Sequence, residues 1–238
     1  MKRSTTRVGV KRGLGFLTTA TLTSVALFAL AGQALAVASA AAERPVAVWH
    51  MEKPARMVDS SDHGNDGTTT NIRRADGFSR KGYHFDGTSS IVTVPSTPSL
   101  NPGRANISIT VHARFEKLPK AEGYDLLRKG LSTNRGGDYK IEAERNAQSN
   151  GAWPTCTFRG SAATAKVVGL VNVADDRWHA ITCAKTSNRV QIVVDGKTVT
   201  RKVEVGSIAN TAPLTIGGKS IGGDSYAGDM DEASVEIG

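Results

Sequence analysis

The chain has 238 residues, with 30 lysines and arginines, 22 acids and two cysteines. Five of the basic residues lie within the first twelve positions, so the remainder of the chain carries a net charge of only about +3. Such a small and scattered surplus of positive charge argues against nucleic acid as a partner. The length suits a single domain with a sizeable core, preceded by a leader.

The first 42 residues have the order of a secretory signal peptide. A basic stretch ends at Arg12, an uncharged apolar run covers residues 14–32, and Ala-x-Ala sites follow at residues 34–36 and 38–40. This order predicts cleavage between residues 36 and 43, a domain over residues 43–238, and a secreted protein with no membrane association after cleavage. An uncleaved membrane anchor is the alternative, since the apolar run nearly reaches spanning length.

Short stretches of alternating apolar and polar residues follow, separated by glycines and Asp-Gly pairs. The clearest covers residues 106–115, and a second one at residues 189–194 turns at Asp195-Gly196 into residues 197–203, which predicts a β-hairpin. Further strands are predicted at residues 46–50, 83–85, 90–94, 138–144, 153–158, 178–185 and 214–216. Roughly ten to fourteen strands, each with one apolar face, predict an all-β fold of two stacked antiparallel sheets. Residues 121–137 show no clear pattern, and a helical turn there is left open.

The two cysteines, Cys156 and Cys183, each lie in a predicted strand. In an exported protein an even pair of cysteines indicates a disulfide. We predict a cross-link between neighbouring strands, which closes a loop of about 27 residues and contributes about 3 kcal/mol in the loop-entropy account. A redox or metal pair is the alternative, and it needs further ligands nearby.

Several short motifs, each weak alone, form an ordered set along the chain. They include VWHME at residues 48–52, DSSDHGNDG at 59–67, GYHFDG at 82–87, VVDGK at 193–197, LTIGG at 214–218 and GDMDE at 228–232. The set resembles the laminin-G-like domain of the concanavalin A-like lectin/glucanase superfamily over residues 45–237. The resemblance implies a jelly-roll sandwich and an extracellular module that binds glycans or proteins, often with a bound calcium ion. Because the superfamily also contains glycoside hydrolases and polysaccharide lyases, the fold alone does not decide the function.

The last motif raises the question of a metal site. Ala233, Val235 and Ile237 alternate as a strand with its core face, and Asp231 shares their parity, so we predict that Asp231 points inward at the rim of the sandwich. A buried, unpaired carboxylate costs several kcal/mol, so Asp231 needs a compensating partner. Backbone N–H groups at the start of the strand are one candidate partner, and a calcium ion is the other.

Calcium takes six to eight oxygen ligands and accepts backbone carbonyls. Together with the resemblance, this favours a structural calcium ion bound by Asp231, Glu52 and the backbone of Gly64 and Asn65, with Asp59 in reserve. Glu52 is included because the first and last strands of a jelly roll often lie together. Asp and Asn also dominate ordinary turns, so a plain turn is the alternative for residues 59–67.

Catalysis by carboxylates is the main alternative function. Glycoside hydrolysis needs two carboxyl groups about 5 to 9 Å apart, and glucanases of this superfamily carry them on one strand as Glu-x-Asp-x-Glu. Here the Asp229-x-Asp231 pair is followed by Ala233, and we interpret Glu142 and Glu144 as a solvated strand face. A polysaccharide lyase that uses histidine and tyrosine, for example His112 and Tyr139, is a further alternative.

The sequence therefore predicts a secreted, non-enzymatic binding module for a glycan or an extracellular protein, stabilised by calcium. Polar, glycine-rich loops at residues 130–137, 148–153 and 220–226 are typical of recognition loops and equally of plain connectors. Trp153 lies in one of them, where an indole can stack on a sugar ring. The residues that contact the ligand and the oligomeric state are left open.

Overall fold

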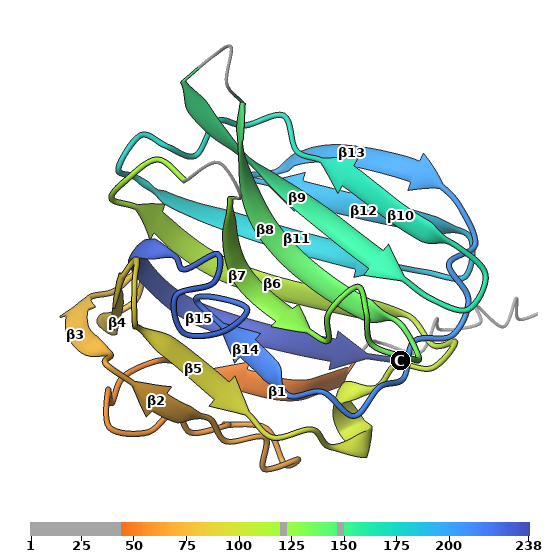
Figure 1. The fold of residues 1–238 in the computed structure, drawn as a ribbon, viewed down its shortest axis with the longest axis horizontal. Coiled ribbons are helices and arrows are strands. Elements are labelled where there is room, and N and C mark those ends of the chain that lie inside the picture. Colours follow the sequence, from red (N-terminus) through yellow and green to blue (C-terminus); the bar gives the residue numbers. More distant parts are fainter. Residues whose placement is uncertain (1–43, 120–122, 147–149) are drawn as a thin grey trace, which may run out of the picture. The chain divides into compact units, whose positions relative to one another are not determined.

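Two antiparallel sheets lie face to face in the described part of the chain (Figure 1). The computed structural model describes residues 44–119, 123–146 and 150–238. The predicted signal peptide lies outside these residues, so it stays a prediction. The predicted all-β, two-sheet sandwich is confirmed, with fifteen strands in the described ranges.

The first sheet has eight strands. The last strand of the chain, β15, lies at its centre, between β6 on one side and both β4 and β1 on the other. In spatial order the strands are β13 (Lys197–Lys202), β12 (Arg189–Val194), β11 (Trp178–Lys185), β6 (Ile107–Phe115), β15 (Ala227–Ile237), β4 (Lys81–Asp86) and β3 (Arg73–Asp76), with β1 (Arg44–Trp49) paired to the second half of β15.

The second sheet has seven strands and carries the groove described below. In spatial order they are β10 (Thr164–Val168), β9 (Gly151–Arg159), β8 (Asp138–Asn146), β7 (Tyr124–Lys129), β14 (Leu214–Ile216), β5 (Ile91–Val94) and β2 (Thr68–Thr70). A single turn of 3-10 helix, η1 (Pro98–Leu100), follows β5. The described residues include no helix that is long and apolar enough to cross a membrane.

The core lies between the two sheets and is built from the alternating residues of their strands. In β6 the residues at odd positions, from Ile107 to Phe115, are buried, and those between them are partly exposed. This matches the predicted pattern, because successive side chains of a strand point to opposite faces. The predicted hairpin is also confirmed: Asp195 and Gly196 have φ angles of 49° and 78°, as a type I′ turn between β12 and β13 requires.

Four strands were not predicted from the sequence: β2, β3, β7 and β10. Strand β7 lies in the stretch where a helical turn had been left open. All six of its residues are buried, including Asp125, Arg128 and Lys129, so its sequence does not alternate between apolar and polar residues. A register shift between Asp125 and Leu127 disturbs the pattern further. Strand β3, with the sequence RRAD, lies at a sheet edge and has no buried residue.

The predicted disulfide between Cys156 and Cys183 is present. Its predicted position between neighbouring strands is wrong, because Cys156 lies on β9 of the seven-stranded sheet and Cys183 on β11 of the eight-stranded sheet. Both residues belong to the core faces of their strands and are fully buried. The bond therefore crosses the core and ties the two sheets to each other.

Candidate functional site

The sequence predicts that Asp231 points into the core, and the structure shows that this is wrong. Strand β15 begins at Ala227, and its pairing with β6 is interrupted by a bulge between Asp231 and Ser234. Glu232, inside the bulge, has a φ of 47°. An extra residue in a strand shifts the alternation of faces, so Met230 and Ala233 both enter the core. Asp231 lies on the outer face with its cross-strand neighbour His112.

The segment before β4 covers Asp231 so completely that its side chain has no exposed surface. Oδ2 accepts a hydrogen bond from the backbone N–H of Ser79 at 2.8 Å, and Oδ1 accepts one from Glu232 N–H at the same distance. A Cβ on Gly77 would lie 2.6 Å from Oδ2, so only glycine allows this approach. Burial raises the pKa of Asp231, the two N–H groups lower it, and the nearby Glu232 and Glu52 carboxylates raise it.

The residues predicted to bind calcium lie in two separate networks. Glu52 belongs with Asp231, and its Oε1, a buried atom without a hydrogen bond, faces Arg80 Nε at 2.9 Å. Asp59 instead accepts the N–H groups of Val48 and Asn65 at 2.9 and 2.8 Å.

The backbone carbonyl of Asn65 accepts the indole N–H of Trp49 at 2.8 Å. Gly64, with a φ of 66°, forms the turn before it. In the three described ranges, no three acidic, histidine or cysteine side chains are grouped to hold a metal ion. The five predicted ligands therefore do not fit calcium as one set. Among them, only Asp231 and Glu52 are carboxylates close enough to repel each other, and a bound cation would reduce this repulsion.

Calcium binding at Asp231 and Glu52 stays a prediction that thermal unfolding tests. We expect a chelator to lower the melting temperature by several degrees, because an ion that binds only the folded state stabilises it. Added calcium should restore the original value, and Asp231→Asn should remove the response. A melting curve of the original protein that is the same with and without chelator contradicts calcium binding and leaves the N–H groups of Ser79 and Glu232 as the partners of Asp231.

A groove runs over the outer face of the seven-stranded sheet. Its volume is about 590 Å³, within the range of ligand pockets. One row of cross-strand neighbours, all on this face, passes over the whole sheet. From β2 to β10 it reads Thr68, Thr93, Thr215, Arg128, Lys140, Thr157 and Lys166. A parallel row contains Asp125 on β7, Glu142 on β8 and Thr155 on β9.

The charges in and beside the groove are arranged as five acid–base pairs. Arg159 Nε lies 2.6 Å from Asp138 Oδ2, and Lys219 Nζ lies 2.9 Å from Asp224 Oδ2. The other three pairs are Arg128 with Asp125, Lys140 with Glu142, and Lys166 with Glu144. Asp125 lies below the groove lining and is 1% exposed, whereas the other nine residues line the groove. The groove is therefore strongly polar but has no net charge.

The row through Glu142 keeps unused hydrogen-bonding capacity. Burial raises the pKa of both Asp125 and Glu142. The nearby cations act in the opposite direction: Arg128 and Lys140 lower the pKa of Asp125, and Lys140 lowers that of Glu142. Beside Glu142, Oδ1 of Asp125 and Oγ1 of Thr155 are buried and have no hydrogen-bond partner in the described part of the chain. Buried polar atoms without a partner are rare in proteins, so this row differs from an ordinary polar strand face.

Two of the three loops singled out in the sequence border the groove. Leu131, Ser132 and Thr133 line it from one loop. Asp224 lines it from the predicted loop at residues 220–226, and Lys219 from the position just before that loop. In the third loop, residues 147–149 lie outside the described residues. Trp153 belongs to β9, where its cross-strand neighbour is Glu144, so its partly exposed indole lies on the same outer face.

The structure places the residues of two catalytic alternatives considered from the sequence, the pair Glu142 and Glu144 and the pair His112 and Tyr139. Glu142 and Glu144, interpreted as a solvated face, lie in the groove instead, and Glu142 is only 9% exposed. His112 and Tyr139 cannot act together, because His112 is on the outer face of one sheet and Tyr139 is buried in the other, with its hydroxyl donating to Leu100 O at 3.0 Å. The sequence missed Asp125 and Arg128 because β7 has no alternation. The signal for the groove that was visible in the sequence is the run of charged residues at every second position of residues 138–144, which form part of β8.

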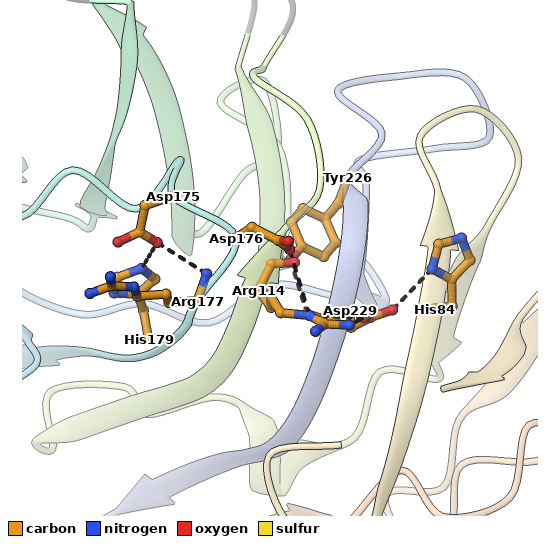
Figure 2. A network of polar contacts seen from close by, with 8 residues as sticks. All are labelled: His84, Arg114, Asp175, Asp176, Arg177, His179, Tyr226 and Asp229. Atoms are coloured by element: carbon orange, nitrogen blue, oxygen red, sulfur yellow. Dashed lines mark hydrogen bonds and ion pairs between the residues drawn. The ribbon is translucent and has the colours of Figure 1, made fainter. Parts of the chain in front are cut away.

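A second polar row lies on the outer face of the eight-stranded sheet (Figure 2). Arg73, His84, Asp229, Arg114 and Trp178 are cross-strand neighbours on five adjacent strands. Figure 2 shows Asp229 between its two partners: Arg114 Nη2 at 2.5 Å and His84 Nδ1 at 2.9 Å. The hydrogen bond with Asp229 raises the pKa of Arg114. A 440 Å³ cavity opens here, but the buried Asp229 carboxylate is already engaged by the side chains of Arg114 and His84, so we assign it a structural role.

The chain belongs to the concanavalin A-like lectin/glucanase superfamily, whose family model matches residues 86–236. This confirms the resemblance found in the sequence. Among curated proteins, none matches the chain.

Solved structures resemble the fold over most of its length. The binding domain of Paraclostridial Mosquitocidal Protein 1 matches with a TM-score of 0.65 and 13% identity, over 81% of this chain and 48% of that chain. Domain 4 of AbnA, a GH43 extracellular arabinanase from Geobacillus stearothermophilus, in complex with arabinotriose, matches with a TM-score of 0.60 and 16% identity, over 82% and 93%. The binding domain of Botulinum Neurotoxin DC in complex with SialylT gives 0.60 and 15%, over 81% and 47%.

This chain thus spans about half of the matched toxin chains and nearly all of the matched arabinanase domain. At such identities the likeness establishes the fold alone.

Proposed function

We propose that this protein is a secreted, non-catalytic binding module whose groove on the seven-stranded sheet holds an uncharged glycan chain. The observation that carries the proposal is the pairing of every charged side chain in the groove with an opposite charge. A polyhydroxyl ligand offers donors and acceptors at each sugar ring. Acid–base pairs that are already neutralised provide both acceptors and donors without demanding a charge from the ligand.

The charge balance also selects against other classes of ligand. An anionic polymer would meet five cations, four carboxylates in the lining and a fifth carboxylate, Asp125, directly beneath it, so it gains no net attraction in the groove. On β9, as the cross-strand neighbour of the groove residue Glu144, Trp153 offers a flat apolar surface of the kind on which sugar rings stack. The disulfide between Cys156 and Cys183 is typical of oxidising, extracytoplasmic compartments, which supports secretion and therefore extracellular partners.

The non-catalytic part of the proposal rests on the state of the carboxylates. Glu142 is held by Lys140 and Glu144 by Lys166, so neither is a free nucleophile or base as the structure stands. Of the pair Asp229 and Asp231, Asp231 has no exposed surface and Asp229 is held by Arg114. The matched toxin chains are binding domains, and the matched arabinanase domain was solved in complex with arabinotriose, which favours binding as well.

Binding of the domain, residues 43–238, to an immobilised array of neutral and acidic glycans tests the proposal. We expect neutral glycans to be retained in preference to uronic-acid and sulfated ones, with little dependence on salt because no net charge is matched. Reducing ends measured over the same panel should not increase with time. Release of reducing ends that Glu142→Gln abolishes would establish the hydrolase instead, and absence of binding to any glycan would overturn the proposal.

A further inference from the structure

A smaller pocket opens beside the groove at its β7–β14 end. Its volume is about 330 Å³, and it shares Arg128, Leu131 and Lys219 with the groove. A ligand lying in the groove can therefore extend a substituent into this side pocket without leaving the sheet. The inference below rests on the proposed function, since it concerns which glycan the groove selects.

The walls of the side pocket are more apolar than those of the groove. Leu131, Ala212 and Pro213 line it, and Leu131 is 41% exposed, one of the few large apolar side chains at the surface of the described residues. Exposed apolar side chains gathered in a concave site favour a ligand that brings apolar surface of its own. A sugar hydroxyl does not provide such a surface, whereas a methyl group does.

Arg128 supplies a fixed hydrogen-bond donor at the pocket. The residue is only 6% exposed, and two of its nitrogens are held within the protein: Nε donates to Gly130 O at 3.0 Å and Nη1 to Asp125 Oδ2 at 2.5 Å. The third nitrogen, Nη2, makes no hydrogen bond to any described residue. Because it is also not one of the buried atoms that lack a partner, it must be accessible from the pocket. A guanidinium held at two corners in this way presents the third to a ligand with little loss of freedom.

A second donor lies on the loop that follows β7. Asn134 also lines the pocket, and its side-chain oxygen is engaged by the backbone N–H of Leu131 at 2.5 Å. Its amide nitrogen has no acceptor among the described residues. The side pocket thus combines apolar walls with N–H donors that lack acceptors, and the charge of Arg128 is already balanced by Asp125.

We propose that this side pocket selects glycans that carry an acetamido group, as N-acetylhexosamines do. The acetyl methyl group lies against Leu131 and Pro213, and the acetyl carbonyl oxygen accepts a hydrogen bond from Nη2 of Arg128. A plain hydroxyl leaves the apolar wall uncovered, and a free amine offers no acceptor to Arg128. A carboxylate meets apolar walls and a cation whose charge Asp125 has neutralised.

Matched pairs of glycans test the inference. The array carries the same glycans with N-acetylhexosamine, hexose or free hexosamine at one position, and affinities are compared for the original protein, Leu131→Asn and Leu170→Asn. We expect the original protein to prefer the N-acetylated form by about tenfold, the effect of one satisfied carbonyl and one covered methyl group. Leu131→Asn should reduce the preference, taken as the ratio of the affinities for the N-acetylated and hexose forms of each pair, to about threefold or less.

Leu170 is the matched control, because it is 65% exposed and lies outside both the groove and the side pocket. Its replacement should leave the preference unchanged. If the original protein binds the hexose or free-amine forms as tightly as the N-acetylated ones, the inference is wrong while the groove keeps its proposed function. If no member of any pair binds, the proposed function and the inference are both overturned.

Discussion

Replacing Glu142 by glutamine should weaken glycan binding by about tenfold or more. The substitution keeps the size of the side chain but removes the charged acceptor at the centre of the groove, and a hydrogen bond to a charged group contributes about 1.5–3 kcal/mol. It also leaves Lys140 without its partner. Affinity measured by titration calorimetry with a glycan identified on the array gives the size of the loss.

Folding should not explain this loss. The pKa of Glu142 is raised by burial, which means that the carboxyl takes up a proton more readily in the folded than in the unfolded state. Such a group stabilises the fold at low pH, and this contribution is lost as pH rises through its raised pKa. Glutamine, which resembles the protonated form, should therefore leave the melting temperature at pH 7 unchanged or slightly higher.

Glu236→Gln is the matched control. Glu236 lies on β15 of the eight-stranded sheet, where its cross-strand neighbour is Ser108, whereas the groove lies on the seven-stranded sheet. We expect it to alter neither binding nor melting. Equal binding by Glu142→Gln and the original protein would show that the groove is not the binding site. Affinity of the original protein should also fall as pH is lowered toward 4.5, the ordinary value of a glutamate carboxyl, and the fall should begin above that value.

Replacing Lys129 by methionine should destabilise the fold by about 3 kcal/mol, which lowers the melting temperature by about 10 °C for a domain of this size. Lys129 is fully buried, and its ammonium donates to Ser96 Oγ at 3.0 Å and to the backbone oxygens of Asn210 and Ala212 at 2.9 Å each. Methionine fills similar space but removes the ammonium donor from all three oxygens, and among the described residues only Asn210 O keeps another donor, the Ser96 hydroxyl at 3.3 Å. Chemical denaturation gives the free energy of unfolding for comparison.

The pH dependence of stability provides a second measurement on Lys129. Burial lowers its pKa from 10.5 to about 8, so between these values the unfolded chain binds a proton that the folded chain does not. Stability should therefore rise with pH across this range in the original protein, and the rise should be smaller in the methionine variant. Lys197→Met, at an exposed position of β13, should change stability by less than about 0.5 kcal/mol. A Lys129→Met variant as stable as the original protein would contradict the assigned role.

Alternation along the chain was enough to predict most strands, because each of them has one face in the core. It failed where the physical basis of alternation is absent. All residues of β7 are buried, so polar and apolar positions do not separate, and Asp125 and Arg128 escaped notice. The bulge at Glu232 has the opposite effect: alternation is visible on both sides of it, but the two halves are out of phase.

The disulfide illustrates what the sequence already contained. Cys156 alternates with Thr155 and Thr157, and Cys183 with Thr182 and Ala184, so both cysteines share the parity of the core residues in their strands. Two core-facing residues on strands of different sheets meet across the interior, whereas neighbours within one sheet lie side by side. The candidate groove was harder to predict, because two of its strands, β7 and β10, were not predicted, and because sequence order does not place β14 beside β7.

The pairing of β1 with β15 bears on how the domain responds to force. Arg44 at the start of β1 lies opposite Ile237 at the end of β15, and Trp49 lies opposite Ala233. Tension applied at Arg44 and Ile237 therefore acts on the same end of this ladder and loads its hydrogen bonds one after another. Strand β1 should peel away at low force, while β15 remains held by β6 and β4 and the disulfide keeps the two sheets joined.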